Sequence, residues 1–160
     1  MSDTLTLAKK EYNKTDASGK QLLENIFGKD AFQRDFKEIK CFEDACNANG
    51  TNADDILPYK DPINDKQEAM NAFAMMCEIV EAINPDFVPD YGNSNQPKWY
   101  PWFEWDNLAS GFRFNASGYV NVRTHSAGGS RLCSETIEKS NYIGKQFIDI
   151  WNKILIKKNQ

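Results

Sequence analysis

The chain has few of the residues and motifs on which catalysis most often depends. Its 160 residues include one histidine, and its four cysteines form no CxxC pair, which argues against a zinc site. No GxxxxGK[ST] loop is present, so the chain carries no Walker-type phosphate site. We therefore predict a non-enzymatic protein with no catalytic residues, no metal and no cofactor.

Long apolar runs are also missing. No stretch approaches the ~20 residues that a membrane helix needs. The first residues, "MSDTLTLAKKEYNK", lack an apolar core followed by a cleavage site. We expect a cytoplasmic protein without a membrane partner, in which the cysteines stay free thiols.

The charge of the chain is unevenly distributed. The net charge of -4 argues against binding to duplex DNA. Residues 41–97 hold 2 basic against 11 acidic side chains, whereas residues 98–160 hold 9 against 5. An anionic ligand should therefore bind the C-terminal part. The alternative is that these basic residues form a solvated face that pairs with the acidic middle.

The spacing of apolar residues predicts an α+β protein with a helical N-terminal segment, 1–40, and an α+β domain, 41–160. The clearest helix is residues 66–83, with Asp65 and Glu68 as a capping pair. A last helix is expected near 135–155, with Phe147 in the middle of its apolar row. Gly144 inside that helix indicates close packing.

Between these helices the apolar period changes to that of strands. Three short strands are predicted in "WYPWFEW", "GFRFN" and "YVNVRTH", joined by turns at "DNLAS" and "ASG". Short connections make this a three-stranded antiparallel meander packed against helices. In the first strand, Trp99, Phe103 and Trp105 fall on one face, and Tyr100, Trp102 and Glu104 fall on the other.

The second face of this sheet is the candidate binding site. Aromatic rings beside cations are typical of sites for bases or nucleotides. The glycine-rich turn "AGGSR", residues 127–131, could present backbone N–H groups to a phosphate. The alternatives are a face buried in the core or in an interface, a hydrogen-bonding histidine at a strand end, and a purely structural turn. The predicted ligand-binding residues are Tyr100, Trp102, Arg113, Arg123, His125, Ser130 and Arg131.

The motifs "YPWFE", "GSRLC" and "GKQF", in that order, resemble a family of small uncharacterised proteins from phages and mobile elements of Bacteroidetes. "LLENIFGKDAF" and "IKCFEDACNANG" resemble the N-terminal part of the same family. The resemblance implies a phage or mobile-element origin, and hence the host cytoplasm. It supplies no binding or catalytic residues.

Together these features predict a binding protein that sequesters a small anionic aromatic ligand such as a nucleotide, as an anti-defence protein would. Two alternatives stay open at this point. One is single-stranded nucleic-acid binding, and the other is a protein-interaction module that inhibits a host factor. A homo-oligomer is compatible with each of these functions.

Overall fold

The computed structural model describes residues 3–12, 14–32, 34–123 and 131–157. The chain divides into two compact units, Met1–Asp35 and Phe36–Gln160, and each is described by itself. None of the described helices is both long and apolar enough to cross a membrane.

The first unit is a pair of helices followed by a short 3-10 turn. Its elements are α1 (Asp3–Tyr12), α2 (Ala17–Phe27) and η1 (Lys29–Phe32). The α2 helix begins after Asp16, whose side chain accepts a hydrogen bond from the N–H of Gly19, as N-cap residues do. Phe32 stacks on Tyr12 with 4.4 Å between ring centroids, so an aromatic contact joins η1 to the end of α1.

The second unit contains the remaining elements, and it combines helices with one β-hairpin. They are η2 (Phe36–Glu38), α3 (Phe42–Asn49), α4 (Ala53–Ile56), α5 (Asp65–Ile83), β1 (Lys98–Asp106), β2 (Gly111–Val120), α6 (Ile137–Gln146) and α7 (Ile148–Leu155). The α+β class is therefore confirmed.

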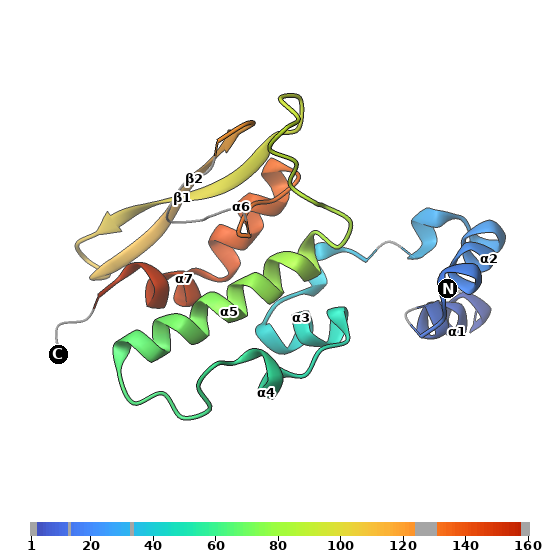
Figure 1. The fold of residues 1–160 in the computed structure, drawn as a ribbon, viewed down its shortest axis with the longest axis horizontal. Helices are drawn as coiled ribbons and strands as arrows, with labels where there is room; N and C mark the ends of the chain where they lie inside the picture. The colour runs from blue at the N-terminus through green and yellow to red at the C-terminus, as the bar shows by residue number, and fades with distance from the viewer. Residues whose placement is uncertain (1–2, 13, 33, 124–130, 158–160) are drawn as a thin grey trace. The chain divides into compact units, whose positions relative to one another are not determined.

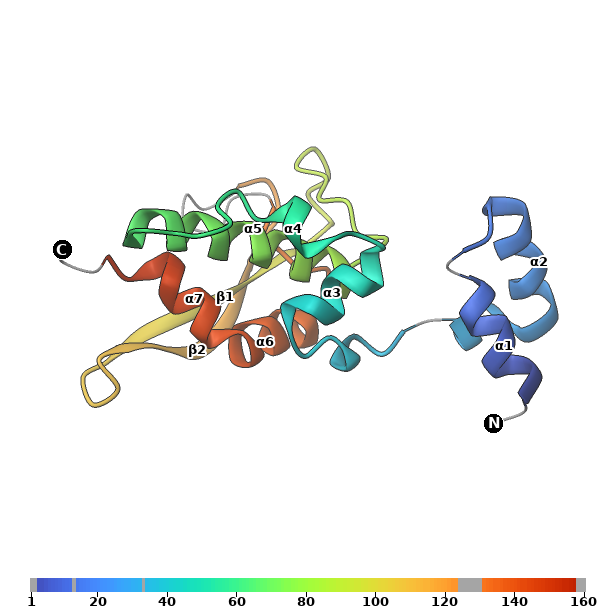
Figure 2. The same ribbon diagram turned by 90° about the horizontal axis from the view of Figure 1, so that it is seen from below.

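The hairpin and the helices form layers (Figures 1 and 2). One face of β1 and β2 packs on α6 and α7, α7 packs on α5, and α5 packs on α3. The core lies between the helices, where apolar side chains from distant segments meet, as expected for layered domains. Its buried members are Ile39, Phe42, Ala45, Cys46, Met76, Ile79, Val80, Ala82, Ile83, Leu132, Ile143, Phe147 and Trp151.

The long helix α5 agrees with the prediction for 66–83, but its cap differs. The N-cap is Asn64, whose side chain accepts from the N–H of Gln67 at 3.0 Å. Asp65 is thus the first helical residue rather than the cap. Its carboxylate still lies in the first turn, where negative charge is favourable.

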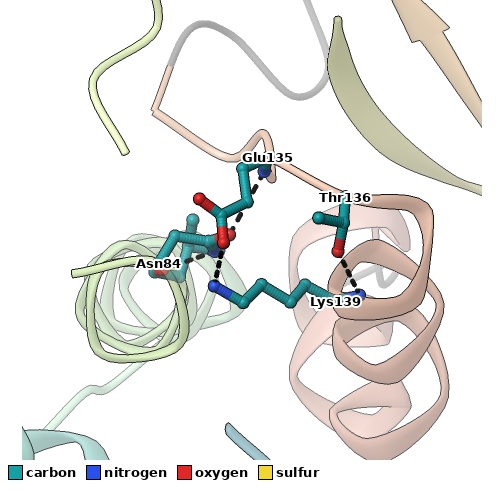
Figure 3. A network of polar contacts seen from close by, with 5 residues as sticks. Asn84, Glu135, Thr136 and Lys139 are labelled. Atoms are coloured by element: carbon teal, nitrogen blue, oxygen red, sulfur yellow. Dashed lines mark hydrogen bonds and ion pairs between the residues drawn. The ribbon is translucent and has the colours of Figure 1, made fainter. Parts of the chain in front are cut away.

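A polar network joins the end of α5 to the start of α6 (Figure 3). The amide of Asn84 donates to the carbonyl of Val80 at 2.8 Å and accepts from the N–H of Glu135 at 3.2 Å. Glu135 in turn forms an ion pair with Lys139. The segment that precedes α6 is therefore fixed to α5 by side-chain hydrogen bonds.

The prediction of a three-stranded meander is wrong: within the described residues the sheet has two strands, β1 and β2, paired antiparallel. The predicted second strand and the first residues of the third belong to one continuous strand, β2. Trp102 lies opposite Ala116 and Phe103 opposite Phe114. Asn115 is therefore an extra residue, and β2 carries a bulge there.

The small residues "ASG" do not form the predicted turn because they are paired with β1. Gly118 lies opposite Tyr100 and beneath the indole of Trp102. A Cβ at Gly118 would lie 2.6 Å from Nε1 of Trp102. The glycine therefore allows close approach of a large side chain, which is its second common role besides turns.

The predicted helix 135–155 is two helices, α6 and α7, which meet at Phe147. Phe147 is buried in the core, as predicted. Gly144 of α6 lies against the hairpin, because a Cβ there would be 2.8 Å from Cβ of Pro101 and would also overlap the Phe114 ring. The prediction of close packing at Gly144 is confirmed.

Replacement of this glycine should destabilise the protein. Gly144→Ala gains about 1 kcal/mol of helix propensity, but overpacking costs about 1–3 kcal/mol. We expect a net loss of stability in urea denaturation followed by circular dichroism. Asn141→Ala on the same helix is the control, with an expected change within about 0.5 kcal/mol. A Gly144→Ala protein more stable than wild type would show that the hairpin can move away from α6.

Candidate functional site

The face of the hairpin that points away from the helices is the candidate site, and we call it the outer face. The opposite face touches the helices: the Phe103 ring lies 5.0 Å from that of Trp151, and the Ser117 hydroxyl lies 2.8 Å from that of Ser140. Side chains alternate along a strand. The outer face therefore consists of Lys98, Tyr100, Trp102 and Glu104 of β1 with Arg113, Ala116, Gly118 and Val120 of β2.

One end of the outer face is closed by the segment 85–97. Tyr100 is buried, and its hydroxyl lies 2.7 Å from the hydroxyl of Tyr91. Burial raises the pKa of the Cys133 thiol, and hydrogen bonds with the Tyr100 and Tyr91 hydroxyls oppose part of that rise. Tyr100 is therefore held in a polar cluster inside the unit and is not exposed for stacking on a ligand.

Lys98 anchors the same segment. Its side chain is fully buried, and Nζ donates to the carbonyl oxygens of Asp90, of Gln96 at 2.8 Å and of Asn121 at 2.7 Å. The ammonium also lies 5.1 Å from the centroid of the Tyr91 ring. These contacts satisfy all three ammonium protons, so we assign Lys98 a structural role.

The other end of the outer face is open. Trp102 is 52% exposed, with its indole across Gly118. Next to it, Arg113 forms an ion pair with Glu104, which is its neighbour across the hairpin. This end presents a flat apolar ring beside a pair of opposite charges. An anion that binds Arg113 would have to compete with the Glu104 carboxylate.

The structure thus brings together some of the predicted site residues. Tyr100, Trp102 and Arg113 share the outer face, as expected from the strand alternation, but Tyr100 is covered. Arg123 follows β2 and is exposed. His125 and Ser130 lie outside the described residues.

Arg131 is exposed, and its positive charge influences a thiol on α5. Burial raises the pKa of the Cys77 thiol on α5, and the positive charge of Arg131 opposes part of that rise. Within the described segments, no acidic side chain forms an ion pair with Arg131. Arg131 is thus an exposed cation with α5 as one of its neighbours.

The sequence prediction missed the far end of the hairpin. Trp105, which was predicted on the same strand face as Phe103, is 49% exposed, and Leu108 at the turn is 99% exposed. The turn extends away from α6 and α7 (Figure 2). The only signal in the sequence was the aromatic run itself, because alternation assigns a face to Trp105 but does not say where the helices end.

Trp105 is held in place although it is exposed. Its Nε1 donates to the side-chain oxygen of Asn107 at 3.0 Å, and its ring meets that of Phe112 edge to face with 5.4 Å between centroids. Two half-exposed tryptophans therefore flank Phe103 on opposite faces of one strand. We call residues 102–113 the hairpin end.

The described residues contain no metal site, because no three His, Cys, Asp or Glu side chains among them lie close enough together to hold a metal ion.

Comparison of the chain with protein-family models, with curated proteins and with solved structures gives no match to any of them. The outer face and the hairpin end are therefore the features of the chain that bear on its function.

Proposed function

We propose that this protein is a non-enzymatic binding protein of a phage or mobile element, and that it docks on a partner protein through the hairpin end. The observation that carries the proposal is the exposure of two ordered tryptophans, Trp102 and Trp105, with Leu108 between the strands. Tryptophan is the residue type most enriched among the hot spots of protein interfaces.

The expected gain from burying these rings is large. A tryptophan can bury about 200 Å², so covering a half-exposed ring removes about 100 Å² from water. At about 25 cal/mol per Å² this contributes about 2–3 kcal/mol for each ring. Both rings are already held by contacts within the hairpin, so little side-chain entropy is lost on binding.

Charge indicates what kind of surface the partner offers. The hairpin end itself holds two acidic side chains, Glu104 and Asp106, and one basic side chain, Arg113, which is paired with Glu104. Lys145 of α6 is exposed, with Nζ 5.4 Å from the centroid of the Phe114 ring in β2. We therefore propose a partner protein that offers an apolar groove without a strong charge of either sign, since complementary potentials select the partner.

The test compares the wild type with Trp105→Ser. Immobilised protein is incubated with an extract of a Bacteroidetes host, the enriched proteins are quantified, and each candidate is purified for a direct affinity measurement. We expect one partner whose Kd rises about 30- to 100-fold with Trp105→Ser. Val88→Ser, which changes an exposed residue outside the hairpin, should leave that Kd unchanged.

Two results would contradict the docking proposal. One is an enriched set that is the same for wild type and Trp105→Ser. The other is the absence of direct binding by any purified candidate.

A nucleotide-like ligand is the second candidate function, favoured by the exposed Trp102 ring and by the exposed Arg131. Stacking on an aromatic ring contributes about 1–3 kcal/mol per base. Under this hypothesis, a calorimetric screen of mono-, di- and cyclic nucleotides should find a ligand that Arg131→Ala binds about tenfold to a hundredfold more weakly. Absence of binding by the wild type would remove this candidate and leave the docking proposal intact.

A further inference from the structure

The edge of β2 at Phe112 is bound by a side chain of α7. The N–H of Phe112 donates to Oδ1 of Asn152 at 2.7 Å, and Nδ2 of Asn152 donates to the carbonyl of Phe112 at 3.0 Å. A side-chain amide offers the same kinds of donor and acceptor as a peptide group. Asn152 therefore bonds to the edge of the hairpin as a residue of a neighbouring strand would.

This contact reaches Trp105 through Phe112, which lies directly opposite Trp105 across the hairpin. Because both backbone groups of Phe112 bond to Asn152, they point away from β1. Phe112 and Trp105 are thus a pair without mutual backbone hydrogen bonds, the kind in which facing side chains are closest. Their rings meet edge to face with 5.4 Å between centroids. The backbone position of Phe112 therefore sets the position of the ring against which Trp105 packs.

The helix that supplies Asn152 is itself fixed in the core. The preceding residue, Trp151, is buried, and the centroid of its ring lies 5.0 Å from that of Phe103 in β1. Successive residues of α7 thus hold the two strands, Trp151 through its ring and Asn152 through its amide. The second of these contacts acts directly behind the exposed Trp105.

The turn of the hairpin has hydrogen bonds of its own, but they do not relate it to the helices. The carboxylate of Asp106 accepts from the N–H groups of Leu108 at 2.9 Å and of Ala109 at 3.3 Å. These bonds join residues of the turn to one another and give it its shape. The Asn152 contact spans 40 residues of the chain, so it relates that shape to the rest of the unit.

We infer that Asn152 is a positioning residue for docking, a role that rests on the proposed function of the hairpin end. Through Phe112 it holds the Trp105 ring in the orientation that the partner meets. A ring that is already oriented loses less freedom on binding, and rigid support of the contact residues strengthens a binding site.

The test compares Asn152→Leu with a matched control, Asn71→Leu. Asn71 makes the same kind of contact elsewhere: it accepts from the N–H of Tyr59 at 3.0 Å and donates to the carbonyl of Tyr59 at 2.7 Å. Both variants replace an asparagine that binds one backbone residue twice. Neither Asn71 nor Tyr59 belongs to the hairpin or to α7.

Proton–nitrogen NMR spectra of the full chain follow the amide of Phe112 and the indole N–H of Trp105. In Asn152→Leu the Phe112 amide should exchange with solvent about tenfold faster, relative to the amide of Ile79 in the core of α5. The Trp105 indole resonance should move in the same variant. In Asn71→Leu it should stay in place, although that protein also loses two hydrogen bonds.

Asn152→Asp is the conservative variant. Its carboxylate keeps an acceptor for the N–H of Phe112 but has no donor for the carbonyl. Its Phe112 exchange rate and its Trp105 indole shift should therefore lie between those of wild type and Asn152→Leu. If Asn152→Leu does not fold, an indole of Asn152→Asp that stays at the wild-type position overturns the inference.

An unmoved Trp105 indole in folded Asn152→Leu would also overturn it, and no partner takes part in that measurement. In the affinity measurement with the enriched partner, Asn152→Leu should raise the Kd about three- to tenfold, and Asn71→Leu should leave it unchanged. A Kd of Asn152→Leu equal to that of wild type would rule out the role in docking. Absence of any partner would contradict the proposed function, whereas the NMR spectra alone decide whether Asn152 positions Trp105.

Discussion

Lys98→Met should lower the free energy of unfolding by about 3–5 kcal/mol. The ammonium is buried, and it donates to the backbone carbonyls of Asp90, Gln96 and Asn121. Methionine keeps an unbranched side chain but has no donor. Several carbonyls would be left without partners in a buried site, and each such group costs about 1–3 kcal/mol.

Urea denaturation monitored by circular dichroism measures this loss, and hydrogen exchange locates it. The segment 85–97 should exchange faster in Lys98→Met than in wild type, because the lysine attaches that segment to β1. Lys153→Met, at an exposed position of α7, is the matched control and should change stability by less than about 0.5 kcal/mol. Equal denaturation midpoints for Lys98→Met and wild type would show that water replaces the ammonium.

Phe147→Ala should also cost about 3–5 kcal/mol, by removal of apolar contacts and creation of a cavity. Phe147 lies at the junction of α6 and α7, is buried, and contacts Tyr142 edge to face with 6.1 Å between ring centroids. Its N–H bonds the carbonyl of Ile143, and its carbonyl accepts the first hydrogen bonds of α7. The backbone of Phe147 therefore joins the two helices, and its buried ring anchors that junction in the core.

The denaturation midpoint is again the measurement, and Ile137→Ala is the control. Ile137 is partly exposed at the start of α6, so its truncation should cost less than about 1 kcal/mol. If Phe147→Ala and Ile137→Ala were equally destabilising, the core could collapse around the missing ring, and the junction would be held by backbone hydrogen bonds alone.

Features that depend on local spacing were predicted from the sequence. The α5 helix, the alternation of faces along β1, the core position of Phe147 and the close packing at Gly144 agree with the structure. The first three follow from the fixed periods of helices and strands, which are 3.6 and 2 residues, and the fourth follows from the cost of a glycine inside a helix. Such periods are set by backbone geometry and do not depend on distant parts of the chain.

Only the tertiary structure decided which side chains of a strand face are buried and which are exposed. Alternation places Tyr100 and Trp102 on the same face, but the segment 85–97 covers Tyr100 and leaves Trp102 exposed. Likewise, small residues such as those at 116–118 can form either a turn or a strand. Here they pair with β1, and Gly118 leaves room for the Trp102 indole. In both cases the outcome depends on long-range contacts, and the local pattern is compatible with either arrangement.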